Sequence, residues 1–336
     1  MKKILALLLA LCMVLPLAAC GDSKQPEAEG DFHLVLKLSH VFAPGEALTK
    51  TMDSIAERIK ERTNGAIEIQ TFPQGQLATY KDGLEQVVRG SEFISVEDPS
   101  YLGDYVPDFN VLAGPMLVNS FEEYEYLLQS DEVKAMFEAA EQKGIKILNL
   151  DYIFGFRSMM TNKVIEKPED LKGLQIRTPG SQLYVDTINH MGATAVPLPF
   201  SETISAVQQG VVDGLEGTID AYATNGSAEV AKNMALTKHL LGVCGAYIST
   251  KVWDTIPEEY QIIIQEEFNA GAAEMVKTIA EGEAATRKQL EEEMGITFNE
   301  VDSAAFQEKV APIYDNMPGV TPGLYDRFKE IIAEMP

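Results

Sequence analysis

LKGLQIRTP, residues 171–179, indicates the fold most directly, because it puts a charge at the end of a short apolar strand. The strand expected over residues 174–177 stops before Pro179-Gly180. In open α/β sheets, ligands bind outside the carboxyl ends of the strands. Arg177 is therefore a candidate ligand contact, since a guanidinium can hold a carboxylate with two parallel hydrogen bonds. A structural salt bridge or an exposed charge is the commoner role for such an arginine.

Strand and helix patterns alternate on both sides of this stretch. The second half of the alternation predicts strands at 156–161, 174–177, 195–198 and after 211–214, a helical turn at 167–171, and helices at 182–191 and 201–209. The first half predicts strands at 34–38, 66–70 and 93–96 and helices at 45–62 and 79–89. Such alternation is typical of parallel sheets. Two similar units in one chain predict a two-lobed α/β fold with a ligand cleft between the lobes.

Two further segments are expected to connect the lobes. A strand over residues 145–150 is a candidate to cross between them. A helical pattern runs from Pro257 to about residue 294, and Gly271 and Gly282 are candidate bends in it. At 1.5 Å per residue this helix reaches about 50 Å, which is longer than one small lobe, so it is expected to brace both.

The first twenty residues predict an export signal. Lys2 and Lys3 precede an apolar run that is too short for a membrane-spanning helix. The run ends in Leu-Ala-Ala-Cys, which resembles the bacterial lipobox and makes Cys20 the expected lipidation site. A plain signal with an incidental cysteine is the alternative. Residues 21–31 are expected to be a flexible tether, so that the protein is exported and lipid-anchored to the outer face of the cytoplasmic membrane.

Charge and cysteine content exclude several classes of protein. The chain has 27 basic and 51 acidic residues, a formal charge of −24, and loss of Lys2 and Lys3 would make it −26 (25 − 51). Nucleic-acid binding needs a basic surface, so it is not expected. Of the three cysteines, only Cys244 would remain unmodified in the mature protein, so no internal disulfide is expected.

The sequence lacks the common motifs of catalysis. It contains no Gly-x-Ser-x-Gly elbow, phosphate loop or His-Glu-x-x-His, and its four histidines do not show metal-ligand spacing. Catalytic residues, a metal and a cofactor are therefore not expected. An exported hydrolase or lyase is the less favoured alternative to a binding protein.

Several motifs resemble those of the solute receptors of TRAP transporters, the DctP-like family. These motifs are LKGLQIRTP at 171–179, MGATAVPLPFSE at 191–202, AVQQGVVDG at 206–214, QGQL at 74–77, LTKH at 236–239 and WD at 253–254. The resemblance implies lobes formed by residues 32–154 with 243–282 and by residues 155–242 with 283–330. It also implies hinge closure on a small organic acid and delivery to the TRAP membrane subunits. A receptor of an ATP-driven importer is an alternative.

The resemblance also implies the ligand contacts. It places the family's carboxylate-binding arginine at Arg177, and a second arginine, used by sialic-acid receptors, at Arg157. It implies further contacts at Phe200, Ser39 and Asp98, with His40 and Glu97 as alternates one residue away. Because the acidic groups could accept hydrogen bonds from hydroxyls, a sugar acid is favoured over a C4-dicarboxylate, a keto acid or an aromatic acid.

One run departs from the family pattern. The family often has Asp-Gly-Gln-Glu-Asn where this chain has DGLEG at 213–217, and the family's Asn helps to hold the carboxylate. Glu216 and Gly217 remain candidate ligand contacts. Because Gly217 has no side chain, a backbone N–H or a water would take over that role, or the ligand is larger there.

The lipobox generates a test of membrane anchoring. Cys20→Ser should release the protein from the membrane fraction or leave the signal uncleaved, because the lipid acceptor is lost. Cys12→Ser, in the apolar run, is the matched control and should remain anchored. Membrane fractionation with mass spectrometry of the N-terminus measures both. Membrane retention of Cys20→Ser with a normally processed, unlipidated N-terminus would refute lipidation.

Overall fold

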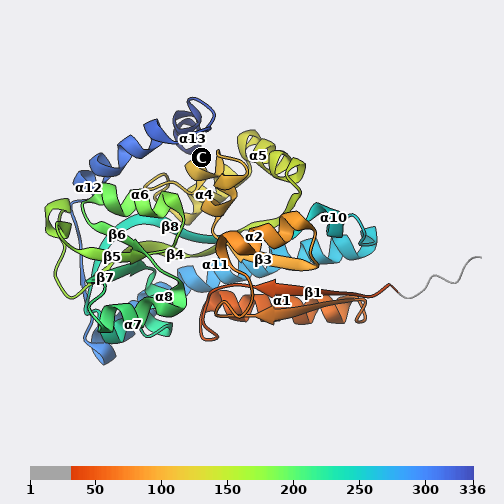
Figure 1. The fold of residues 1–336 in the computed structure, drawn as a ribbon, viewed down its shortest axis with the longest axis horizontal. Coiled ribbons are helices and arrows are strands. Elements are labelled where there is room, and N and C mark those ends of the chain that lie inside the picture. The colour runs from red at the N-terminus through yellow and green to blue at the C-terminus, as the bar shows by residue number, and fades with distance from the viewer. Residues whose placement is uncertain (1–31) are drawn as a thin grey trace, which may run out of the picture. The chain divides into compact units, whose positions relative to one another are not determined.

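A mixed β-sheet forms the centre of the fold (Figure 1). The computed structural model describes residues 32–336. The sheet of this part has nine strands in the order β2-β1-β3-β8-β4-β7-β5-β6, and β9 pairs with β8. The strands are β1 Leu34–Ser39, β2 Ile67–Phe72, β3 Phe93–Glu97, β4 Ile145–Thr161, β5 Gln175–Thr178, β6 Thr194–Pro197, β7 Gly214–Gly217, β8 Asn233–Ser249 and β9 Thr297–Asn299.

Each end of the sheet is parallel, as the alternation of strands and helices predicts. We call β1, β2 and β3 the first half of the sheet and β5, β6 and β7 the second half. β1 pairs in parallel with β2 and β3, and β5 pairs in parallel with β6 and β7. The carboxyl ends of β3 and β5 carry Glu97 and Arg177, so both halves present charged residues where their strands end.

The centre of the sheet is antiparallel and connects the halves. β4 and β8 pair with each other along their length, β8 also pairs with β3, and β4 also pairs with β7. The two strands expected at 145–150 and 156–161 are parts of the single strand β4. The sequence pattern did not predict β8, nor the antiparallel pairing that results from it. Register shifts between Ile147 and Met159 interrupt the ladder where the chain passes from one half to the other.

Helices surround the sheet in Figure 1. Those in the first part of the chain are α1 Ala47–Arg62, α2 Tyr80–Arg89, α3 Phe109–Leu112, α4 Phe121–Leu128 and α5 Asp131–Gln142, with the 3₁₀ helix η1 Pro99–Asp104. The following ones are α6 Gln182–Met191, α7 Thr203–Gln208, α8 Ile219–Thr224, α9 Ser227–Val230 and α10 Thr250–Trp253, with η2 Pro168–Leu171 and η3 Phe200–Glu202. The last are α11 Glu258–Met294, α12 Ser303–Val310 and α13 Leu324–Ala333, with η4 Ala311–Asn316. None of the helices in the described part of the chain is long and apolar enough to cross a membrane.

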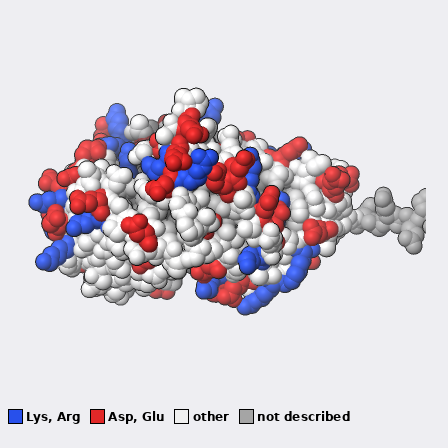
Figure 2. Space-filling model, turned by 90° about the horizontal axis from the view of Figure 1, so that it is seen from above, with Lys and Arg blue, Asp and Glu red and all other residues white. Residues whose placement is uncertain are grey.

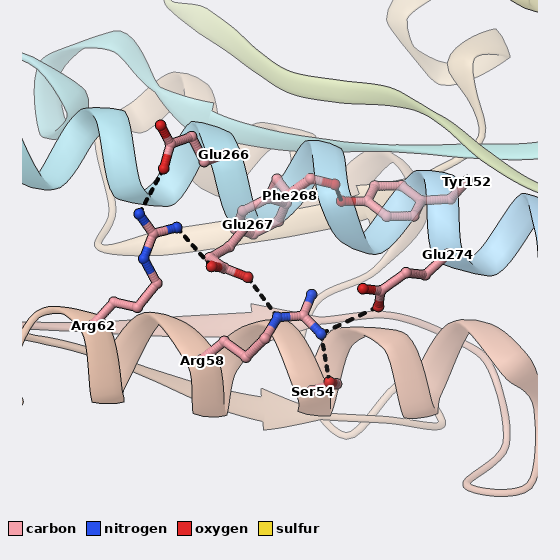
Figure 3. Close-up of polar contacts among 8 residues, drawn as sticks. All are labelled: Ser54, Arg58, Arg62, Tyr152, Glu266, Glu267, Phe268 and Glu274. Carbon is pink, nitrogen blue, oxygen red and sulfur yellow. Dashed lines mark hydrogen bonds and ion pairs between the residues drawn. The ribbon is translucent and has the colours of Figure 1, made fainter.

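α11 packs along α1, which lies between β1 and β2 in the chain, along β4, and along α8, which follows β7. Figure 3 shows the polar contacts between α1 and α11. Arg58 Nε lies 2.5 Å from a carboxylate oxygen of Glu267, and Arg62 Nη1 lies 2.7 Å from the other. The Tyr152 hydroxyl of β4 donates to the carbonyl of Phe268 at 2.9 Å. These bonds attach α11 to both α1 and the crossing strand.

Apolar spacing explains how α1 packs. Leu48, Met52, Ile55 and Ile59 recur at helical spacing and are all buried.

Acidic and basic side chains are interspersed over the face drawn in Figure 2. The predicted signal at residues 1–20, the lipidation site Cys20 and the tether at residues 21–31 lie outside the described residues.

Gly271 and Gly282 lie within a continuous α11 and do not interrupt it. A Cβ at Gly271 would lie 2.5 Å from Ile55 Cδ1 and 2.6 Å from its Cγ1, so this glycine allows α1 and α11 to approach closely. A Cβ at Gly282 would have no heavy atom within 4 Å. The two glycines therefore have different roles in one helix.

This difference predicts opposite effects on stability. Gly271→Ala should lower the free energy of unfolding by about 1–3 kcal/mol, because the methyl group overpacks a buried interface. Gly282→Ala, the matched control, should raise it by about 0.5–1 kcal/mol through helix propensity alone. Urea denaturation of both variants measures the difference. Equal effects would show that the close approach at Ile55 is easily relieved.

Candidate functional site

A closed cavity lies where the strand ends of the two halves meet. Its volume is about 60 Å³. Seven residues that the sequence nominated as ligand contacts line it: Glu97, Asp98, Arg157, Arg177, Phe200, Glu216 and Gly217. A more open groove of about 370 Å³ lies between α1, α8 and α11, but none of its charged lining residues is fully buried. The closed cavity is therefore the better candidate site.

Arg177 is a buried cation with no carboxylate partner. Only 1% of its surface is exposed. Its Nε and Nη2 donate to the carbonyl of Leu198 at 3.1 and 2.8 Å, and its guanidinium lies 5.6 Å from the centroid of the Phe200 ring. It forms no ion pair within residues 32–336, and burial lowers its pKa. Because burying an unpaired charge costs free energy, an anion that pairs with Arg177 would bind favourably at this site.

Arg157, in contrast, is already neutralised. Its Nε and Nη2 donate to the two carboxylate oxygens of Glu216 at 2.5 and 2.7 Å. Burial alone would raise the pKa of Glu216, but Arg157 and His239 hold it below its ordinary value. His239 Nε2 lies 3.6 Å from the same carboxylate, and burial lowers the pKa of this imidazole. Arg157 and Glu216 therefore form a structural salt bridge in the cavity wall.

Two tyrosines lie close to Arg177. Tyr80 accepts a hydrogen bond from the Phe200 backbone N–H at 3.1 Å, and its ring centroid lies 5.5 Å from that of Tyr101. The Tyr101 hydroxyl is buried and has no hydrogen-bond partner within the described residues. An unpartnered buried hydroxyl costs free energy unless a ligand or a water contacts it. Tyr80 and Tyr101 therefore extend the anion site beyond the guanidinium.

The backbone of Tyr80 is held in an uncommon conformation. Its φ is 55°, in the left-handed region that non-glycine residues seldom adopt. Its N–H donates to the Glu97 carboxyl at 2.5 Å, which fixes this conformation from the end of β3. Strained residues cluster at functional sites. The position of the Tyr80 hydroxyl thus depends on Glu97.

Buried carboxyls surround the rest of the cavity. Asp98 accepts from the Ser100 N–H at 2.8 Å and from the Tyr184 hydroxyl of α6 at 2.6 Å. Burial raises the pKa of Glu46 and of Glu97 to about 8 in each case, and it raises the pKa of Asp98. None of these three forms an ion pair within residues 32–336. Glu46 and Glu97 are therefore mainly protonated at neutral pH.

Ser39 and His40 do not line the cavity. Ser39 is the last residue of β1 and is buried, and its hydroxyl donates to the carbonyl of Phe72 at 3.4 Å. His40 is also buried, and burial lowers its pKa to about 4. The chain turns after the strand, so Val41 and Phe42 face the cavity in their place. The predicted ligand contacts at Ser39 and His40 therefore lie beside the cavity lining and not in it.

Sequence reasoning missed Glu46, Tyr80, Tyr101 and Tyr184. Tyr101 follows the end of β3 by four residues, so the rule that placed Asp98 at the site could have found it. Tyr184 lies on α6 directly after the LKGLQIRTP stretch. Nothing in the local sequence marks Glu46 or Tyr80 as cavity residues. Gly217 lines the cavity without a side chain, and a Cβ there would lie 3.4 Å from Met160 Cε.

A second, outer cavity adjoins the first one. Its volume is about 480 Å³, and it is lined by residues of η1 and by the start of α6. Tyr101 lines both cavities. Two pairs of adjacent residues are also split between the cavities. Tyr80 and Pro179 line the inner cavity, whereas Lys81 and Gly180 line the outer one. Tyr101 is therefore the lining residue that the two cavities share.

Comparisons with known proteins agree with the fold. Residues 38–318 match bacterial extracellular solute-binding protein family 7, DctP. A TRAP periplasmic solute-binding protein from Desulfovibrio salexigens, in complex with diglycerolphosphate, is 56% identical with a TM-score of 0.88, covering 90% of this chain and 97% of that one. A Fusobacterium nucleatum TRAP protein with bound sn-glycerol-3-phosphate is 44% identical, with the same TM-score and coverage. An Actinobacillus succinogenes protein with bound L-galactonate is 32% identical with a TM-score of 0.86, covering 90% and 100%.

The protonated Glu97 predicts a pH dependence of stability. Between the ordinary glutamate pKa of about 4.3 and the value of about 8 in the fold, the folded protein holds a proton that the unfolded chain has released. The free energy of unfolding should therefore fall as the pH rises through this window. Glu97→Gln should flatten that slope by up to about 1.4 kcal/mol per pH unit.

Denaturation between pH 5 and pH 8 measures the slope. Glu92→Gln, an exposed position just before the same strand, is the control and should leave the slope unchanged. An unaltered slope in Glu97→Gln would show that Glu97 is ionised in the folded protein.

Proposed function

The chain belongs to bacterial extracellular solute-binding protein family 7, the extracytoplasmic solute receptors of TRAP transporters, and we propose that its ligand is a small hydroxylated anion held by Arg177. The family consists of transport receptors and not of enzymes. The observation that carries the proposal is the burial of Arg177 without a carboxylate. An anionic ligand supplies the missing partner, so its binding offsets a cost already present in the fold.

The contacts of Arg177 support a two-pronged grip. The Leu198 carbonyl takes one N–H from Nε and one from Nη2, which fixes the plane of the guanidinium. The remaining N–H groups of Nη1 and Nη2 form a parallel pair that fits two oxygens of one anion. Phe200 covers the face of the group. Arg157 is less suited to hold the anion, because its Nε and Nη2 already donate to the carboxylate of Glu216.

The buried carboxyls support recognition of hydroxyl groups. Glu46, Glu97 and Asp98 form no ion pair within residues 32–336, and a hydroxyl group is a neutral donor whose hydrogen bond a carboxyl oxygen can accept. The neighbours in solved structures hold diglycerolphosphate, sn-glycerol-3-phosphate and L-galactonate, all of which combine an anion with hydroxyls. A glycerol phosphate is the first candidate for this chain, and a sugar acid is the second. A dicarboxylate is less suited, because Arg177 is the one arginine of the lining without a carboxylate partner, and it can neutralise only one of the two charges.

Hydrogen bonds between the halves support capture by hinge closure. Tyr184 of α6 donates to Asp98 after β3 at 2.6 Å, and Phe200 N–H donates to Tyr80 at 3.1 Å. We propose that the moving bodies are the lobes expected from the sequence, 32–154 with 243–282 and 155–242 with 283–330. With a lipid on Cys20, the closed receptor would remain beside the TRAP membrane subunits that accept its ligand.

Substitution of Arg177 tests the anchor. Arg177→Ala should weaken binding by roughly 100- to 1,000-fold, because charged hydrogen bonds are lost in a dry site. Arg177→Lys should also bind poorly, since an ammonium keeps the charge but loses the fork. Titration calorimetry with sn-glycerol-3-phosphate and L-galactonate measures both. Parent-like binding by Arg177→Ala would exclude Arg177 as the anchor.

Stability without ligand separates the two arginines. Arg177→Met should leave the free energy of unfolding of the empty protein unchanged or higher, because an unpaired buried charge is removed. Arg157→Met is the matched control and should lower it by about 3–5 kcal/mol, because Glu216 is left buried and unpaired. Strong destabilisation by Arg177→Met would instead assign Arg177 a structural role.

A further inference from the structure

We infer that Phe42 is a positioning residue of the anion site, because its ring holds the ring of Phe200 and that ring covers the guanidinium of Arg177. The inference rests on the proposed function, in which Arg177 binds the anion. Phe42 follows β1, whereas Phe200 follows β6, so the contact joins segments from opposite ends of the sheet. Phe42 therefore acts on the anion through two other residues.

Hydrogen bonds hold the backbone on which the Phe42 ring is carried. The Phe42 carbonyl accepts from the N–H of Gln74 at 3.1 Å, in the loop that follows β2. The carbonyl of the next residue, Ala43, accepts from Thr49 Oγ1 of α1 at 2.8 Å. Only 8% of the surface of Phe42 is exposed. This residue is therefore a well-anchored point from which a neighbouring ring can be restrained.

Phe42 contacts two aromatic rings, and all three line the inner cavity. Its ring centroid lies 5.2 Å from that of Phe154 on β4, with the two planes at 74°, and 6.5 Å from that of Phe200, with the planes at 47°. Inclined aromatic pairs are favourable beyond the apolar area that they bury, because the positive edge of one ring meets the negative face of the other. Phe42 thus connects β4 with the start of η3.

The segment 198–200 in turn holds Arg177. The carbonyl of Leu198 accepts from Nε and Nη2 of Arg177, and the guanidinium lies 5.6 Å from the centroid of the Phe200 ring. The attraction between a cation and an aromatic face is larger where both are removed from water, as they are around the buried Arg177. The orientation of the guanidinium therefore depends on the orientation of the Phe200 ring.

The Phe200 ring needs a restraint of this kind. Phe200 is half-buried, so fewer neighbours surround it than surround a core phenylalanine. The Tyr80 hydroxyl accepts a hydrogen bond from its backbone N–H at 3.1 Å, but this bond does not fix the side-chain torsions. The contact with the buried Phe42 acts on the ring itself. Loss of Phe42 should therefore loosen the cover of Arg177 while the backbone bond remains.

Titration calorimetry of the full receptor with sn-glycerol 3-phosphate, and with L-galactonate as a second probe, tests the effect on binding. Phe42→Leu should weaken binding by about 3- to 10-fold, because an aromatic contact is lost while an apolar side chain is kept. Phe137→Leu is the matched control and should bind like the parent. The Phe137 ring pairs with that of Phe109 at a similar centroid separation of 6.4 Å, and Phe137 is not part of the cavity lining.

A double-mutant cycle tests whether Phe42 acts through Phe200. Phe200→Leu removes the ring that transmits the effect. In that background, Phe42→Leu should weaken binding by less than about twofold, although it has its full effect in the parent. Equal factors in both backgrounds would show that Phe42 acts by another route, such as Phe154, and would overturn the inference.

A spectroscopic readout separates positioning of Arg177 from a contact that only favours closure. The Nε proton of Arg177 is followed by proton–nitrogen NMR in the receptor saturated with the probe that binds, and its signal is assigned by its loss in Arg177→Lys or, if that variant does not fold, in Arg177→Met. Exchange of this proton with water should be several-fold faster in Phe42→Leu and unchanged in Phe137→Leu. Saturation keeps the site filled, so a change in the fraction of closed receptor does not affect the comparison.

Phe42→Met keeps most of the side-chain volume without the ring, so it should resemble Phe42→Leu and serves in its place if that variant does not fold. Weaker binding with unchanged exchange at Arg177 would assign Phe42 to closure alone. That result, or parent-like binding by both Phe42 variants, would overturn the inference and leave the proposed function intact. Failure of both anions to bind the parent would overturn the proposed function itself.

Discussion

The antiparallel pairing of β4 with β8 is the constraint on which the rest of the molecule depends. Each strand has 17 residues and runs from one half of the sheet into the other. Because the ladder is continuous apart from its register shifts, β3 joins it at one end and β7 at the other. The strand ends that carry Glu97 and Arg177 are thereby brought to the lining of one cavity, and Arg157 of β4 also lines it.

Within that frame, an asymmetry between two arginines gives the cavity its chemistry. Both are buried, but one has a carboxylate and the other has a carbonyl and an aromatic ring. A compensated guanidinium rigidifies the wall and adds no net charge. The unpaired guanidinium of Arg177 makes the empty site less favourable than the anion-filled one. The same residue therefore determines both the affinity for the ligand and the sign of the charge that the ligand carries. The strongly acidic surface of the protein does not oppose this attraction at short range, because salt screens charges beyond about 8 Å.

Local pattern was sufficient to predict the parallel units, since the buried faces of helices such as α1 repeat at fixed spacing. It failed for β8, because a strand buried on both faces shows no alternation and its existence depends on pairing with β4. The sequence likewise placed Arg157, Glu216 and Arg177 together as candidate contacts. It could not reveal that the first two neutralise each other, since they are 59 positions apart. Tyr80 lay beyond local pattern for a similar reason, because its position depends on a left-handed backbone and a bond from β3.

The hydrogen bonds from Tyr184 to Asp98 and from Phe200 to Tyr80 form between protein groups alone. They therefore also favour closure of an empty receptor. In the proposed hinge closure, a ligand enters the open form and not the closed cavity of about 60 Å³. Each 1.4 kcal/mol by which these bonds stabilise the empty closed form reduces the open population, and with it the rate of capture, by about tenfold. In that proposal, the same two bonds affect both how long a solute is retained and how quickly a scarce one is captured.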